Sequence, residues 1–177
     1  MSEIAARLAE PLVSLTDDLI QEFEVRLADS SALAFRVAYS VVRQKEDAED
    51  IAQDAFARAY RRFATLRDRE QFRSWLVRMT WRLALDHRRA AVRRARREQA
   101  VAVLTPSSTQ ADDVAKERRE RLWQAMDALP DKLRLVIVLA AIEGHSVRDV
   151  ATLVAAPEGT IKSRLFEARK RLQELLR

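Results

Sequence analysis

Two short helices joined by a tight turn are predicted at residues 146–171, and this stretch constrains the fold more than any other. Ser146 is a good N-cap, because its hydroxyl can accept a hydrogen bond from a free amide of the first turn. Pro157 suits the start of the second helix, where its missing N–H costs nothing. Apolar residues recur at helical spacing through both segments. They are Val147, Val150, Ala151, Val154, Ile161, Leu165, Ala168, Leu172 and Leu175.

The second helix of this pair carries a basic, hydrogen-bonding surface outside its apolar stripe. The residues on these other faces are Lys162, Ser163, Phe166, Glu167, Arg169 and Lys170. A helix with one buried stripe and a basic outer face fits the major groove of DNA. The alternative is an ordinary helical hairpin with a solvated basic face, because helix-turn-helix patterns often arise by chance.

Composition favours an all-α protein with room for one or two small domains in 177 residues. The chain has only two Gly and four Pro and is rich in Ala, Leu and Arg. The absence of Cys excludes disulfides and thiolate metal sites and fits a reducing cytoplasm, where we expect the protein to act. No signal peptide and no membrane insertion are expected, because no apolar run reaches the roughly 18 residues of a membrane span.

Three helices are expected in the first third of the chain: one from about Leu19 to Leu27, one from about Leu33 to Val42, and the most regular one at Asp47–Phe63. The third begins with acidic residues and ends with basic ones. Compensation of the helix dipole explains this pattern, and on physical grounds alone it is the preferred interpretation. The alternative is an acidic docking surface for a basic partner.

An arginine-rich helix is expected after a polar loop at Arg67–Glu70. The helix begins at Gln71, with Trp75 predicted to lie in the core and the role of Trp81 left open. Seven Arg and one acid then occur between Arg82 and Arg97. Like charges at these spacings repel, so a nearby polyanion would stabilise the segment. Arg with aromatic residues also suits single-stranded nucleic acid, whereas a merely solvated basic face is the alternative.

The loop-forming residues Thr105–Thr109 indicate an interdomain linker. Beyond it we expect a helix at Glu117–Ala128 with Leu122, Trp123 and Met126 buried, and a helix at Lys132–Ile142 capped by Asp131 and closed by Gly144. The predicted organisation is an N-terminal extension (1–24), a first domain (25–98), a linker (99–116) and a second domain (117–177).

Enzyme signatures are missing from the sequence. It has no phosphate-binding Gly loop, no HExxH motif and no nucleophile elbow. The two histidines, His87 and His145, fall in different predicted domains, so metal or acid–base chemistry by this pair is not expected. The sequence therefore predicts a binding protein without a cofactor.

Three segments together resemble bacterial RNA polymerase sigma factors of the extracytoplasmic-function group. DAEDIAQDAFARAYRRF resembles region 2.2, FRSWLVRMTWRLALDHRR resembles regions 2.3–2.4, and LPDKLRLVIVLAAIEGHSVRDVATLVAAPEGTIKSRLFEARKRL resembles region 4. The order and spacing of these segments agree with the family over roughly 33–176. The resemblance implies region 2 and region 4 domains in a sigma factor that binds core RNA polymerase, directs it to promoters and helps to melt the −10 element.

The resemblance also implies roles for individual residues. The residues that match the family's docking site on the β′ clamp helices are Asp50, Gln53 and Asp54. This match favours an acidic docking surface over the dipole compensation that was preferred above. Those implied to contact the −10 element are Arg67, Asp68, Arg69, Arg82, Arg88, Arg89, Arg93 and Arg94. Those implied to read the −35 element are Thr160, Lys162, Ser163, Arg164, Phe166, Glu167 and Lys170. Further partners implied are the β flap of the polymerase, promoter DNA and an anti-sigma factor.

This chain departs from the family pattern at three places. Arg82 stands where the family usually has Asn, so the −10 contacts would differ. Ala155-Ala156-Pro157 replaces the usual Gly-Val-Pro, so the turn either needs no positive φ or tolerates strain. Glu167 stands where a basic residue is common, and its carboxylate could accept a hydrogen bond from a cytosine amino group.

A stand-alone DNA-binding regulator is the second interpretation. It would use only the helix-turn-helix, with the N-terminal helices as a sensor or dimerisation unit. It predicts tight binding to duplex DNA without polymerase. An enzyme is a more remote third interpretation.

Overall fold

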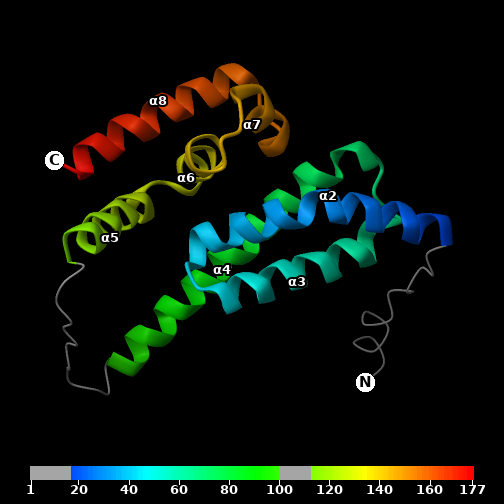
Figure 1. Cartoon of the computed structure of the whole chain (residues 1–177), viewed down its shortest axis with the longest axis horizontal. Coiled ribbons are helices and arrows are strands. Elements are labelled where there is room, and N and C mark those ends of the chain that lie inside the picture. Colours follow the sequence, from blue (N-terminus) through cyan, green and yellow to red (C-terminus); the bar gives the residue numbers. More distant parts are fainter. Residues whose placement is uncertain (1–16, 100–112) are drawn as a thin grey trace, which may run out of the picture. The chain divides into compact units, whose positions relative to one another are not determined.

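The computed structural model describes residues 17–99 and 113–177, and every regular element in these two ranges is helical (Figure 1). The all-α prediction is therefore confirmed. The elements are α2 (Asp17–Val42), α3 (Lys45–Phe63), a 3₁₀ turn η1 (Arg69–Gln71), α4 (Phe72–Gln99), α5 (Asp113–Ala128), α6 (Asp131–Ile137), a π-helical turn η2 (Val138–Ile142), α7 (Val147–Val154) and α8 (Glu158–Leu175). Most of the predicted extension and linker lies outside the described residues.

The chain forms two compact units that divide inside α4, between Leu85 and Asp86. The predicted first domain ends later, at residue 98, and the boundaries derived from the sequence stay predictions. Because α4 runs without interruption to Gln99, the arginine-rich stretch belongs to the same helix as the apolar segment that precedes it.

α2 is one continuous helix, and the prediction of two helices in this stretch was wrong. The run Asp29-Ser30-Ser31 looks like a break in the sequence. In the helix, however, the hydroxyl of Ser31 donates to the carbonyl of Ala28 at 3.2 Å, so the serine hydroxyl has a hydrogen-bond partner without ending the helix. α2 ends at Val42, and the next residue, Arg43, has a left-handed φ of 59° and an N–H that donates to the Tyr39 carbonyl at 2.8 Å.

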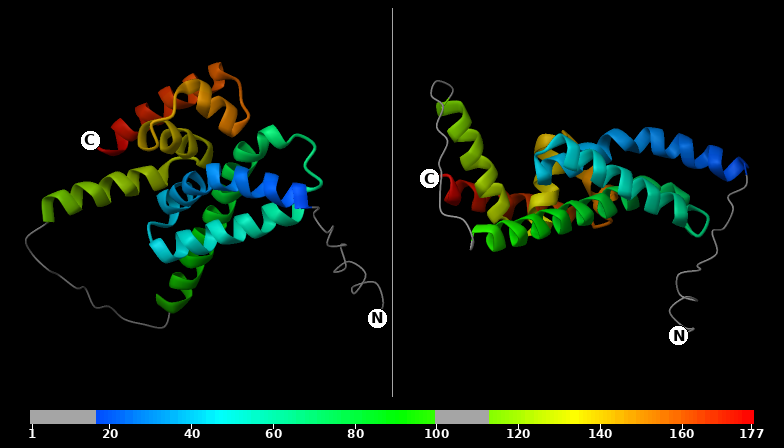
Figure 2. Two further views of the ribbon diagram at one scale, coloured as in Figure 1. Left: turned by 45° about the vertical axis from the view of Figure 1, so that its right-hand side comes forward. Right: turned by 90° about the horizontal axis from the view of Figure 1, so that it is seen from below.

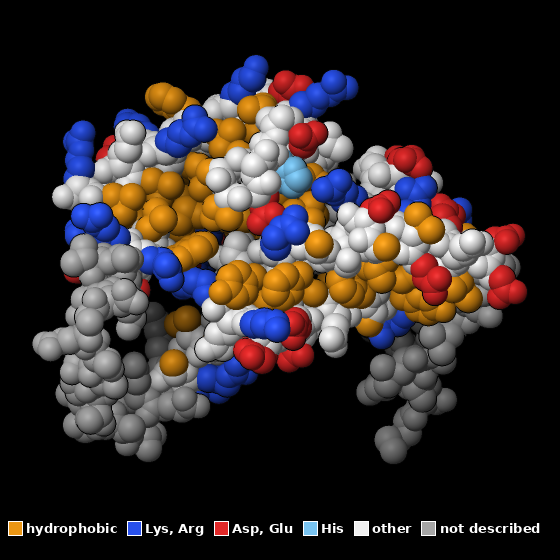
Figure 3. Space-filling view, in the orientation of Figure 1, with side chains coloured by type: hydrophobic (Ala, Val, Ile, Leu, Met, Phe, Trp, Pro, Cys, Tyr) orange, Lys and Arg blue, Asp and Glu red, His pale blue; other side chains and the backbone are white. Residues whose placement is uncertain are grey.

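The core of the first unit is aromatic and joins α2, α3 and the start of α4. Phe23 lies edge-to-face against Tyr60, Phe63 and Phe72, with ring centroids 5.3, 5.3 and 5.7 Å away. α2 and α3 run antiparallel side by side (Figures 1 and 2). A row of hydrophobic side chains follows the line along which they pack, with charged side chains below it (Figure 3). This core brings the start of α2 to the loop between α3 and α4.

In the second unit, α8 packs on α6 and α7 through the predicted apolar stripe. Ile161, Leu165 and Ala168 are buried, as predicted, whereas Leu175 is 51% exposed. Leu122 of α5 is 44% exposed, which also contradicts its predicted burial. Periodicity marks an apolar face, but burial needs a partner of matching length. α8 has 18 residues, whereas α6 and α7 have 7 and 8.

Asp131 does not cap the helix that follows it, contrary to prediction. Pro130 takes the N-cap position without a side-chain bond, and the Asp131 carboxylate accepts a hydrogen bond from Arg134 at 2.8 Å. Arg134 is only 2% exposed and also donates to Asp127 at 3.2 Å. The two carboxylates compensate a buried guanidinium, whose pKa is lowered chiefly by burial. The cap prediction failed because that buried cation competes for the carboxylate.

Candidate functional site

An acidic face on α3 is the first predicted surface that the structure assembles. Asp50, Gln53 and Asp54 are all exposed, whereas Ile51 and Ala55 beside them are buried. Positions three and four apart lie on one side of a helix, so the three polar residues form one surface. Asp54 also bonds Arg58 at 2.9 Å, an exposed pair that contributes little to stability. Such a face suits a basic protein partner.

The loop between α3 and α4 (Ala64–Gln71, here the α3–α4 loop) is shaped by Asp68. One carboxylate oxygen of Asp68 accepts from the Glu70 amide at 3.0 Å, and the other accepts from the Gln71 side chain at 2.9 Å. Short acidic side chains favour such local caps. The cap creates η1 and turns the chain into α4. The predicted loop position is thus a structured turn.

This loop borders a pocket of about 480 Å³ within the first unit. The residues that line it are Arg62, Thr65, Leu66, Arg67, Asp68, Gln71, Trp75 and Arg78. The combination of an aromatic ring, guanidinium groups and an amide can stack on an unpaired base and bond its edge. Arg67 and Asp68 were predicted here.

Three further lining residues were missed by sequence reasoning. Trp75 is half-buried and borders the pocket, so its prediction as a core residue was only partly right. Arg78 follows three residues later on the same face of α4, and Gln71 precedes Trp75 by four residues at the end of η1. That periodicity is the signal that could have identified them. Burial lowers the pKa of Arg78, and the charge of Arg82 lowers it further.

Arg69 takes a different position from its loop neighbours. Its guanidinium is ion-paired with Glu22 of α2 at 3.0 Å and lies over the ring of Phe63, 5.6 Å from the centroid. It is not among the lining residues of the pocket. The predicted DNA contact of Arg69 stays a prediction, and the structure gives this side chain a protein partner.

The predicted arginines of α4 fall into two groups. Arg82, Arg93 and Arg94 are exposed. In the second unit, Arg88 is ion-paired with Asp127, and Arg89 is paired with Asp86 at 3.4 Å and with Asp131 at 2.7 Å. The first group can bind phosphates directly, whereas the second already has carboxylate partners. Trp81, whose role the sequence left open, is buried and 5% exposed.

The turn between α7 and α8 is built by local bonds. The Ser146 hydroxyl accepts from the Asp149 amide at 3.2 Å, and the Asp149 carboxylate accepts from the Ser146 amide at 3.2 Å. This is a capping box. At the other end Ala155 is left-handed, with φ 53°, so the turn does need a positive φ and alanine tolerates the strain.

The outer face of α8 carries the residues predicted for the −35 element. Lys162, Ser163, Phe166, Glu167 and Lys170 are exposed, and Thr160 and Arg164 are half-buried. The Phe166 ring is 73% exposed, although aromatic side chains are normally buried. Glu167 is paired with Arg171 at 2.7 Å, which offsets the charge that would oppose a phosphate.

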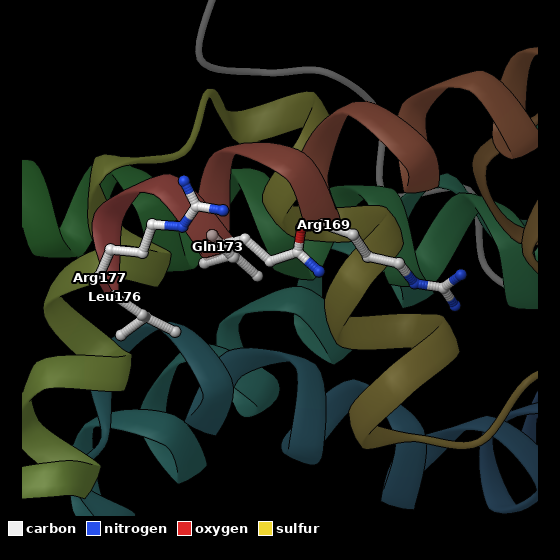
Figure 4. Close-up of a pocket in the computed structure, with 5 residues that line it drawn as sticks. Arg169, Gln173, Leu176 and Arg177 are labelled. Carbon is white, nitrogen blue, oxygen red and sulfur yellow. The ribbon is translucent and has the colours of Figure 1, made fainter.

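A second pocket, of about 610 Å³, lies at the end of α8 (Figure 4). Its described lining combines two leucines with two arginines and a glutamine, from the end of α8 and the two residues that follow it: Arg169, Leu172, Gln173, Leu176 and Arg177. Apolar and cationic groups of this kind suit contact with another macromolecule.

Within residues 17–99 and 113–177, no three or more His, Asp or Glu side chains are grouped so that they could hold a metal ion. None of the helices described there combines the length and the apolar character needed to cross a membrane.

Comparison with known proteins assigns both parts of the chain. The family model for Sigma-70 region 2 matches residues 27–94, and that for Sigma-70 region 4 matches residues 119–172. The chain is 34% identical to the RNA polymerase sigma-H factor of Pseudomonas aeruginosa over 154 residues, which cover 77% of this chain and 78% of that protein. It is 29% identical to the ECF RNA polymerase sigma-E factor of Escherichia coli K12 over 146 residues, 74% and 76% of the two chains.

Solved structures agree with these matches. The sigma factor RpoE from Bartonella quintana, solved in complex with the anti-sigma factor NepR, superposes with a TM-score of 0.59 and 25% identity over 88% of this chain and 97% of that one. CnrH, in complex with the cytosolic domain of CnrY, has the same fold, with a TM-score of 0.60 and 24% identity over 87% and 86%. The chain therefore belongs to the RNA polymerase sigma factors of the sigma-70 family, in the extracytoplasmic-function group.

Proposed function

We propose that this protein binds core RNA polymerase, brings it to promoters and captures an unpaired base of the −10 element. It acts in the cytoplasm as a non-enzymatic subunit. The observation that carries the proposal is the order of three surfaces along one chain. An exposed acidic face on α3 is followed by the pocket at the α3–α4 loop, and both precede a helix-turn-helix with an exposed basic face.

The acidic face of α3 would dock on the β′ clamp helices of the polymerase. Asp50, Gln53 and Asp54 support this role because they are exposed and lie on one face. Charge complementarity would orient the encounter between the two proteins.

The pocket at the α3–α4 loop would receive a base of the melted strand. Trp75 offers a stacking surface, and Gln71 and Arg67 offer donors to the base edge. Arg82, Arg93 and Arg94 would bind phosphates of the DNA backbone, which would make complex formation depend on salt. Capture of an unpaired base would favour the separated strands over the duplex.

The exposed face of α8 would read the −35 element in the major groove. Lys162 and Lys170 would contact phosphates, whereas Phe166 and Glu167 would touch base edges. Glu167 would favour a cytosine, whose amino group donates to a carboxylate.

Binding to core polymerase is the test of this function. The double variant Asp50→Arg/Asp54→Arg should lose affinity for purified core enzyme at least about tenfold in a pull-down or fluorescence titration, because the acidic face becomes basic. Glu24→Arg, an exposed charge reversal on α2, is the matched control and should bind as the wild type does. Failure of the wild-type protein to bind core enzyme would overturn the proposal.

Run-off transcription on genomic fragments then tests promoter selection. With core enzyme and this protein, transcripts should begin at a defined set of 5′ ends that share two upstream elements. Core enzyme alone should not produce them. Transcripts without shared upstream elements would contradict promoter recognition.

We further propose regulation by an anti-sigma factor. RpoE from Bartonella quintana was crystallised with the anti-sigma factor NepR, and its fold covers most of this chain. A partner of this kind would cover the acidic face of α3 and exclude the polymerase. Co-purification of the protein from its native host, followed by competition with core enzyme, tests this partner.

A stand-alone regulator remains the second candidate, supported by the exposed Phe166 and the basic face of α8. Direct titration of duplex fragments distinguishes the two functions. Tight, sequence-specific duplex binding without polymerase would favour the regulator.

A further inference from the structure

A charge network connects the start of α2 to the α3–α4 loop. Glu22 accepts from Arg69 at 3.0 Å and from Arg26 at 3.1 Å, and Arg26 donates to Glu70 at 2.7 Å. The four residues, here the α2–loop network, form a chain of alternating charges in the order Arg69, Glu22, Arg26 and Glu70. The two loop residues of this network, Arg69 and Glu70, thus each have a partner on α2 that is more than forty positions away in the sequence.

The network joins a rigid element to a loop. Phe23, adjacent to Glu22, is 6% exposed and lies in the aromatic core against Phe63 and Phe72, the residues on either side of the loop. The Arg69 guanidinium lies over the Phe63 ring, a cation–π contact that adds to the ion pair. The hydrogen bond to Glu70 is the largest influence on the Arg26 guanidinium and raises its pKa.

Different residues of the loop serve two surfaces. Arg67, Asp68 and Gln71 line the pocket, whereas Arg69 and Glu70 bond α2. Asp68 and Arg69 are adjacent in the chain, and the Asp68 carboxylate accepts from the amide of Glu70. The pairs that hold Arg69 and Glu70 therefore constrain the short segment that also carries the pocket residue Asp68.

We propose that Glu22 and Arg26 are positioning residues for base capture, acting through Arg69 and Glu70. The inference rests on the proposed function of the pocket. It extends the recognition machinery to two residues that precede the matched region 2 segment, which begins at residue 27. It also assigns Arg69 a role in shaping the loop in place of direct contact with DNA.

Charge exchange tests this assignment. Holoenzyme, assembled from core polymerase and the full chain, is offered a pool of single-stranded oligonucleotides with random sequence, and the bound fraction is sequenced. Arg69→Glu should lower the preference at one base position by up to about fivefold, the upper end of the scale for loss of one ion pair. Exchanging all four charges (Glu22→Arg/Arg26→Glu/Arg69→Glu/Glu70→Arg) should restore that preference, because every pair of the network is rebuilt with opposite polarity.

The second pair of the network provides an independent arm. Glu70 is 84% exposed, so Glu70→Arg will not impair folding. It should reduce the same base preference, and the fourfold exchange should restore it. Glu24→Arg is the matched control and should leave the preference unchanged. Affinity for core enzyme and the thermal midpoint should stay at wild-type values in the fourfold variant.

Each outcome has a defined meaning. An unchanged preference in Arg69→Glu and Glu70→Arg would overturn the inference. A loss that the fourfold exchange does not restore would also overturn it, because the charges would then act on DNA directly. Absence of any base preference in the wild-type holoenzyme would instead overturn the proposed function of the pocket, and the positioning role with it.

Discussion

The helix-turn-helix and the α3–α4 loop both present polar side chains for recognition, but contacts of different range hold them in place. Ser146 bonds Asp149 three residues away, and the N–H of Ala155 donates to carbonyls of the preceding turn. In the loop, by contrast, Arg69 bonds Glu22 across 47 positions. The turn of the helix-turn-helix is thus held by local bonds, whereas the loop combines the local bonds of Asp68 with long-range pairs to α2.

This difference has a physical consequence. A locally bonded turn loses little when distant residues change, because its partners lie in the same short segment. A loop held by distant partners keeps its shape only while the core between them is intact. The two recognition surfaces should therefore respond differently to the same kind of substitution.

The largest expected effect follows from removing the aromatic centre of the first unit. Phe23→Ala should cost about 3–5 kcal/mol of unfolding free energy, because a buried ring is replaced by a cavity. Hydrogen exchange measured by mass spectrometry should show lost amide protection in α3 and the loop. Protection in α7 should persist. Phe166→Ala, at a ring 73% exposed, is the control and should change stability by less than about 0.5 kcal/mol. An equal loss of amide protection in α7 would contradict the view that the two surfaces are stabilised independently.

A smaller and local effect is expected from the cap of α7. Ser146→Ala should destabilise that helix by about 1 kcal/mol, because the first-turn amide of Asp149 loses its acceptor. Urea unfolding followed by amide hydrogen exchange would measure the loss of stability in α7. The α3–α4 loop should keep its protection, and a parallel loss there would show that the two surfaces are coupled.

The turn itself offers a stabilising substitution. Ala155→Gly should raise the unfolding free energy by roughly 0.5–1 kcal/mol, because glycine adopts the left-handed φ of 53° without steric cost. Ala156→Gly is the matched control, since Ala156 does not have a positive φ, and it should destabilise slightly. The denaturation midpoint should shift upward in Ala155→Gly and downward in Ala156→Gly. A destabilised Ala155→Gly protein would indicate an unstrained turn.

The smallest effect concerns pH. Hydrogen bonds from the Ser146 side chain and amide lower the pKa of Asp149 below its usual value. The capping box therefore contributes stability above the pKa of the unfolded chain and loses it as pH falls through the lowered folded value. Comparing acid titrations of the α7 helix in the wild type and in Asp149→Asn, by circular dichroism or NMR, would isolate this contribution. An identical pH profile in both proteins would contradict it.

Sequence reasoning succeeded where a feature depends on near neighbours. The all-α class, the caps at Ser146 and Gly144, and the buried stripe at Ile161, Leu165 and Ala168 all follow from spacing and local bonding. The assignment to sigma factors came from three segments in a fixed order, and comparison with known proteins confirmed it.

Other features could not be read from the chain, because they arise when distant segments meet. The continuity of α2 and the competing partner of Asp131 depend on neighbours that local propensity does not contain. The pairing of Arg69 with Glu22 needs α2 and the α3–α4 loop to be brought together by the aromatic core. Charge and spacing therefore indicate which residues are candidates for contact with DNA, whereas tertiary packing decides which of these side chains are exposed and which are paired with other parts of the protein.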